Sequence, residues 1–69
     1  MIKEGSEVNW KWGNGIAKGK VKETYDHTVS KNIEGNEITR HGETGNKALF
    51  IIQDDGSHVL KLESEVKHS

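Results

Sequence analysis

The sequence predicts an all-β protein, a small barrel or sandwich of short antiparallel strands. Apolar and polar residues alternate along several segments, which is the period of a β-strand. Turns rich in glycine, asparagine and aspartate separate these segments, and no stretch of about ten residues has a helical period. With 69 residues, no cysteine and no proline, we expect a single domain over residues 1–69, with an ordered core at about 5–66.

The composition predicts a thin core and excludes several classes of protein. Apolar residues make up 30 % of the chain and charged residues another 30 %, whereas apolar residues are usually about 45 % of a globular domain. The longest apolar run, at 48–52, is far shorter than the roughly 20 residues of a membrane helix. The N-terminus lacks the apolar region of a signal peptide. We therefore expect a cytoplasmic protein with no membrane partner, and the absence of cysteine agrees with that compartment.

The first predicted strand, at 7–12, places two tryptophans on one face. Val8, Trp10 and Trp12 alternate with polar residues, and the Gly-Asn-Gly segment at 13–15 then turns the chain, because both residue types tolerate a positive φ. The tryptophans have two interpretations. They are either core residues, since tryptophan buries a large area in a thin core, or an aromatic surface that binds a cation or stacks on bases.

The second predicted strand, at 17–22, also alternates. Ala17, Gly19 and Val21 share one face, and three lysines share the other. We expect the small residues at 17 and 19 to leave room for the two indole rings of the preceding strand. The lysine face is either a solvated surface or, beside exposed aromatic residues, a surface for single-stranded nucleic acid with Lys18 and Lys20 as contacts.

Residues 27–46 are predicted to form a polar hairpin and loop that project from the body, because they contain few apolar residues. The Gly-Asn pair at 35–36 suits the centre of a primed turn. A two-residue turn at that position predicts two facing pairs, Ile33 with Ile38 and Lys31 with Arg40.

The most apolar strand is predicted at 47–53, and its alternating apolar residues indicate a strand covered on both faces. Asp54 and Asp55 follow it. Adjacent carboxylates can hold a cation or share a proton, but an Asp-Gly pair between two strands is typical of a hairpin turn. A further strand is expected at 58–61, and a final turn or short strand at 64–66.

The sequence has no pattern typical of a catalytic or metal centre. The glycines at 13–19 do not have the spacing of a phosphate-binding loop. No two of the four histidines are closer than ten residues, unlike the ligands of a zinc site. The serines lack a nucleophile-elbow motif. We therefore expect no enzyme activity, no catalytic residue, no bound metal and no cofactor.

Four stretches of the chain, taken in order, resemble a known family: residues 5–13, 17–21, 37–42 and 48–61, with Ser-Glu at 64–65. The Trp-x-Trp-Gly and Gln-Asp-Asp-Gly…Val-Leu-Lys motifs within them are similar to those of the hypervirulence-associated TUDOR-like family, small bacterial and fungal proteins of poorly defined function. The resemblance implies a strongly bent SH3-like or Tudor-like barrel of about five antiparallel strands and no catalytic residues. Where the family often has Asn-Pro-Ala and a tyrosine, this chain has Asn-Lys-Ala-Leu at 46–49, so an aromatic residue of a methyl-lysine cage is missing.

We predict a noncatalytic binding module of the Tudor/SH3-like type that recognises a protein segment, as a monomer. Its surface is expected at the mouth of the barrel, between the turn at 13–15, Tyr25 and the turn at 54–56. One alternative is nucleic-acid binding through a Lys/Trp face, although a net charge of −1 argues against strong nonspecific DNA binding. The other is a structural protein that assembles through a barrel edge. The candidate binding residues are Trp10, Trp12, Tyr25, Lys18, Lys20, Asp54 and Asp55.

Overall fold

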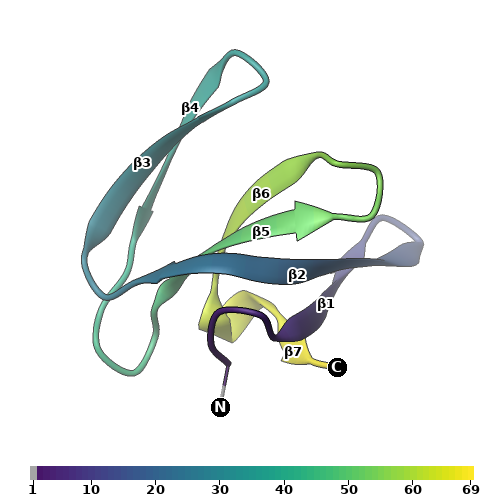
Figure 1. The fold of residues 1–69 in the computed structure, drawn as a ribbon, viewed down its shortest axis with the longest axis horizontal. Coiled ribbons are helices and arrows are strands. Elements are labelled where there is room, and N and C mark those ends of the chain that lie inside the picture. Colours follow the sequence, from purple (N-terminus) through teal and green to yellow (C-terminus); the bar gives the residue numbers. More distant parts are fainter. Residues whose placement is uncertain (1) are drawn as a thin grey trace.

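The computed structural model describes residues 2–69, and over these residues the chain is all-β, with seven strands in two antiparallel sheets (Figure 1). The prediction of an all-β fold is therefore confirmed. The elements, in order, are β1 (Glu7–Trp12), β2 (Gly15–Tyr25), β3 (Thr28–Ile33), β4 (Asn36–His41), β5 (Ala48–Gln53), β6 (His58–Leu62), the 3₁₀ helix η1 (Glu63–Glu65) and β7 (Lys67–His68).

The larger sheet has five strands in the order β6-β5-β2-β1-β7, and all neighbouring pairs are antiparallel. Its two edge strands, β6 and β7, are consecutive in the chain and are joined through η1 alone. The sheet must therefore curl until its edges are within reach of this short connection (Figure 1). Within residues 2–69 no backbone pairing links β6 to β7, so the sheet is strongly curled but not closed into a barrel.

The core lies on the inner face of this curled sheet. The alternation predicted for the first two strands is observed, since Val8 and Trp10 of β1 are buried together with Val21 of β2. Leu49 and Ile51 of β5 complete the cluster. Partly buried apolar residues that pack against it are Ile2, Ala17, Val59 and Val66.

Gly19 is small because β5 lies against β2, and not because an indole ring needs the space. A Cβ atom at this position would collide with Cγ2 of Ile51 and would lie 2.8 Å from the backbone oxygen of Ile52. The expectation that Gly19 makes room for the tryptophans is therefore wrong. Ala17 alone fulfils that expectation, because it faces Trp10 directly in the β1–β2 register.

A β-bulge in β2 turns its second half over. Val21 faces Ile51 in the register, but the next paired residue is Glu23, which faces Phe50. The extra residue, Lys22, exchanges the two faces of the strand. Tyr25, which simple alternation would place on the inner face with Val21, therefore lies on the outer face.

The smaller sheet is the β3–β4 hairpin, whose tip stands away from the five-stranded sheet, as predicted for a projecting polar hairpin (Figure 1). Its turn is centred on Glu34 and Gly35, with φ angles of 52° and 84°, which is the primed type. The turn therefore begins one residue earlier than predicted, because glycine occupies its second central position and not its first. The predicted pairs of Ile33 with Ile38 and Lys31 with Arg40 are wrong; the observed pairs are Ile33 with Asn36, Lys31 with Ile38 and Val29 with Arg40.

The prediction that β5 is covered on both faces is confirmed. Leu49 and Ile51 belong to the inner core, whereas Ala48 is fully buried on the opposite face, together with Leu60 of β6. The β3–β4 hairpin approaches β6, and alternate residues of its strands are half-buried. The outer face thus has a second, smaller region of packing beside the hairpin.

We expect Gly19→Ala to lower the free energy of unfolding by about 2 kcal/mol, because the added methyl group overpacks the β2–β5 contact. Gly15→Ala is the matched control: it lies in the same strand, its φ is not positive, and the nearest atom to its Cβ is the oxygen of Trp12 at 3.9 Å. That variant is expected to stay within about 0.5 kcal/mol of the wild type. Urea denaturation measures both values, and equal losses would contradict the assigned packing.

Candidate functional site

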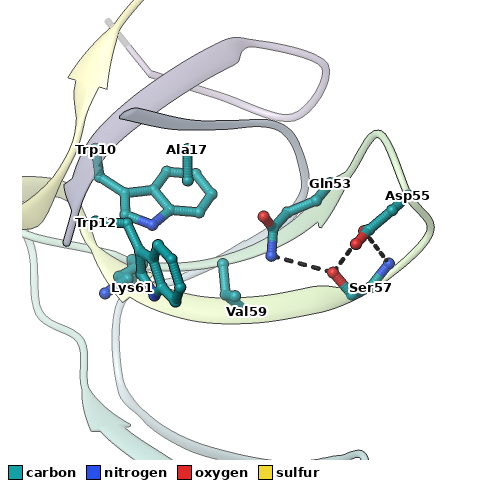
Figure 2. A pocket seen from close by; sticks show the side chains of 8 residues that line it. All are labelled: Trp10, Trp12, Ala17, Gln53, Asp55, Ser57, Val59 and Lys61. Atoms are coloured by element: carbon teal, nitrogen blue, oxygen red, sulfur yellow. Dashed lines mark hydrogen bonds between the residues drawn. The ribbon is translucent and has the colours of Figure 1, made fainter. Parts of the chain in front are cut away.

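An open groove of about 380 Å³ lies on the inner face of the sheet, between the β1–β2 end and the β5–β6 hairpin (Figure 2). Figure 2 shows the two indole groups on one side of this groove and a chain of polar side chains on the other. We call it the tryptophan groove. Its lining residues are Trp10, Trp12, Ala17, Gln53, Asp55, Ser57, Val59 and Lys61.

The two tryptophans share a face but have different environments. Trp10 is 4 % exposed and belongs to the core, whereas Trp12 is 73 % exposed. The register explains the difference, because β5 ends at Gln53, opposite Gly19 of β2. Trp12 faces Gly15, further along, where β2 has no neighbour on its other side. The indole of Trp12 therefore extends beyond the last layer of the core.

The polar side of the groove is held by the turn between β5 and β6. Gly56 adopts a φ of 89° there, and Asp55 Oδ1 accepts hydrogen bonds from the Ser57 backbone N–H at 2.9 Å and from its hydroxyl at 2.6 Å. Gln53 Nε2 in turn donates to Ser57 Oγ at 3.1 Å. The bonds from the Ser57 hydroxyl and then from its backbone N–H lower the pKa of Asp55, so its carboxylate is ionised at neutral pH. The turn predicted at this position is confirmed.

The groove combines apolar, polar and charged groups of both signs. Asp55 is ionised, and Lys61 lines the same surface. Among the lining residues only the two tryptophans are aromatic, and one of them is buried. A single exposed indole does not surround a cation as a cage of several rings does. The arrangement instead offers one flat apolar surface beside hydrogen-bonding side chains.

The structure separates the seven candidate binding residues into three places. Trp10, Trp12 and Asp55 meet in the tryptophan groove. Lys18 and Lys20 lie on the opposite face of β2, since Lys18 faces Asn9 and not a tryptophan, and they border a second depression together with Asp54. Tyr25 lies at the far end of β2, beyond the bulge. The mouth predicted between the two turns therefore includes the tryptophans and Asp55 but not Tyr25.

Five lining residues of the groove were not among the candidate binding residues: Ala17, Gln53, Ser57, Val59 and Lys61. Two of them, Val59 and Lys61, could have been found from the pairing of β5 with β6. In that register Val59 faces Ile51 and Lys61 faces Leu49. Directly opposite residues of an antiparallel pair point to the same face. Both side chains thus belong to the inner face, and a hairpin register counted from the 54–57 turn would have identified them.

No cluster of three or more histidine, cysteine, aspartate or glutamate side chains within residues 2–69 has the geometry of a metal site. Over the same residues, no helix is long and apolar enough to cross a membrane.

The sequence model of the Hypervirulence associated proteins TUDOR domain matches the chain over residues 5–66. The chain belongs to this family. A search of curated proteins finds no match, and neither does a search of solved structures. The family resemblance predicted from the sequence is confirmed, and the protein is a small Tudor-like module.

We expect Trp12 to account for the solvent-accessible tryptophan fluorescence of the protein. Trp10→Phe, which retains the exposed indole, should emit at longer wavelength and be strongly quenched by acrylamide, because its remaining fluorophore is in water. Trp12→Phe should emit at shorter wavelength and resist quenching. Equal quenching of the two variants would contradict the assigned burial.

Proposed function

We propose that this Tudor-like protein is a noncatalytic binding module whose tryptophan groove recognises an extended protein segment. The observation that supports this proposal most directly is the 73 % exposure of Trp12 in a chain with so few apolar residues. Exposed tryptophans next to hydrogen-bonding groups are typical of the central contacts of protein interfaces. The Gln53–Ser57–Asp55 chain supplies such groups beside the indole.

The edge of the sheet favours an extended ligand. Val59 and Lys61 of β6 line the groove, and β6 is an edge strand of the larger sheet. The β3–β4 hairpin approaches β6, but within residues 2–69 no strand forms backbone hydrogen bonds with the other side of β6, so backbone N–H and C=O groups there can pair with a ligand strand. A protein segment could then place one apolar side chain on Trp12 while its backbone follows β6.

Nucleic-acid binding is less well supported, because lysines and exposed aromatic residues lie apart. Binding of single strands combines stacking on aromatic rings with a positively charged path for the backbone. In this chain Lys18 and Lys20 are on the outer face of β2, whereas Trp12 is on the inner face. Assembly through a sheet edge would use the same free side of β6, with a second copy of the chain in place of a foreign segment.

A displayed library of random 12-residue peptides tests the proposal. We expect Trp12→Ala to weaken the binding of enriched peptides at least tenfold, as for the loss of a central interface residue. The same change should alter the free energy of unfolding by no more than about 0.5 kcal/mol, because the side chain is largely in water. Lys18→Ala is the matched control on the other face and should bind as the wild type does.

Three results would contradict the proposal. Enriched peptides that bind Trp12→Ala and the wild type equally would exclude the groove. Salt-sensitive binding of single-stranded RNA or DNA that Lys18→Ala abolishes would favour the nucleic-acid alternative. A dimer in sedimentation experiments that Trp12→Ala leaves intact, together with no enriched peptide, would favour assembly through the edge.

A further inference from the structure

One ammonium group lies among two aromatic rings and a carboxylate on the outer face of the sheet, opposite the tryptophan groove. Lys31 Nζ is 5.0 Å from the centre of the Tyr25 ring and 4.9 Å from the centre of the Phe50 ring. It also donates to Glu23 Oε1 at 3.2 Å. The Tyr25 hydroxyl donates to the same oxygen at 2.6 Å and so orients the carboxylate. Aromatic faces and carboxylates are the groups that hold an ammonium ion in proteins.

The carboxylate and the two aromatic rings that surround the ammonium group all belong to the larger sheet. The bulge in β2 brings Glu23 and Tyr25 to the outer face, where Glu23 faces Phe50 of β5 directly in the register. The rigidity of the central β2–β5 pair fixes these three side chains relative to one another. They form a preorganised site whether or not a cation is present.

The ammonium comes from a different part of the fold. Lys31 lies on β3, in a two-stranded sheet that shares no backbone pairing with the larger sheet over residues 2–69. Apart from the Lys31–Glu23 pair, one ion pair within residues 2–69 links this hairpin to the body, between Arg40 Nε and Glu65 Oε1 at 3.7 Å. The Lys31 side chain can therefore leave the site without breaking any backbone hydrogen bond between the two sheets.

Both charged groups of the pair are stabilised in their ionised forms. The hydrogen bond from Tyr25 and then that from Lys31 lower the pKa of Glu23. The neighbouring Tyr25 and then Glu23 raise the pKa of Lys31. The site therefore holds a carboxylate and an ammonium at neutral pH, and the side chain of Lys31 remains 28 % exposed, so the position is accessible to an external group.

We propose that Glu23, Tyr25 and Phe50 form a binding site for a lysine-type ammonium group and that Lys31 occupies it as an internal ligand. A lysine side chain of a partner protein then binds there by displacing the side chain of Lys31, which is 28 % exposed and can turn toward solvent. The site lies on the face opposite the tryptophan groove and does not depend on the function proposed for that groove.

Nuclear magnetic resonance titration with Nα-acetyl-lysine methylamide tests this site. We expect Lys31→Ala to bind the probe at least tenfold more tightly than the wild type, with shifts at Tyr25 and Phe50, because the internal competitor is gone. Lys18→Ala is the matched control, since it removes the same charge from an exposed position where, within residues 2–69, the ammonium group lies over no aromatic ring. It should bind the probe no better than the wild type. Trp12→Ala should not change the binding, which separates this site from the groove.

The uncharged norleucine analogue of the probe is the chemical control and should cause no saturable shifts. Equal affinity of Lys31→Ala and the wild type would overturn the proposal, as would equal binding of the norleucine analogue. If Lys31→Ala does not fold, Lys31→Met retains a stem of similar length without the charge, and the same comparison applies. No gain in affinity for that variant would also overturn the proposal.

Discussion

The contact between β2 and β5 at Gly19 determines the rest of this structure. At that position β5 approaches so closely that a side chain larger than hydrogen does not fit, and Gly19 faces Gln53, the last residue of β5. The turn that follows therefore lies beside the β1–β2 end, where Trp12 extends past the core. The same pairing continues in the other direction through the bulge and places Glu23 beside Phe50. The β2–β5 register thus positions both the tryptophan groove and the site around the Lys31 ammonium group.

The thin core explains why the two tryptophans have different roles. With apolar residues at 30 % of the chain, the inner cluster needs Trp10 for packing, and this side chain is buried among Val8, Val21 and residues of β5. Trp12 contributes little to that cluster because no strand covers its end of β2. The outer face instead holds the polar hairpin, through charged and aromatic side chains.

Much of the fold follows from local patterns in the sequence. Alternation in β1, the first half of β2 and β5 correctly gave the buried faces, and the Asp-Gly pair correctly gave the 54–57 turn. The wrong predictions concern features that the alternation of apolar and polar residues does not reveal. The bulge at Lys22 reverses the faces of β2 and places Tyr25 on the outer face, opposite the groove. In the β3–β4 hairpin, a one-residue difference in the position of the turn changes every pairing, and glutamate at a positive φ gave no signal for it. Contacts between distant strands, such as Lys31 with Phe50, are fixed only once the register is known.

The most direct test of this account is a nuclear Overhauser measurement on the aromatic side chains of the wild-type protein. The bulged β2–β5 register predicts contacts of the Tyr25 and Phe50 rings with the ε-methylene group of Lys31. It also predicts contacts of the Trp12 indole with residues of the groove and none with Tyr25. Contacts of the Tyr25 ring with the inner-face side chain of Leu49 and none with Lys31, as a β2 strand without the bulge would give, would contradict the separation of the two faces.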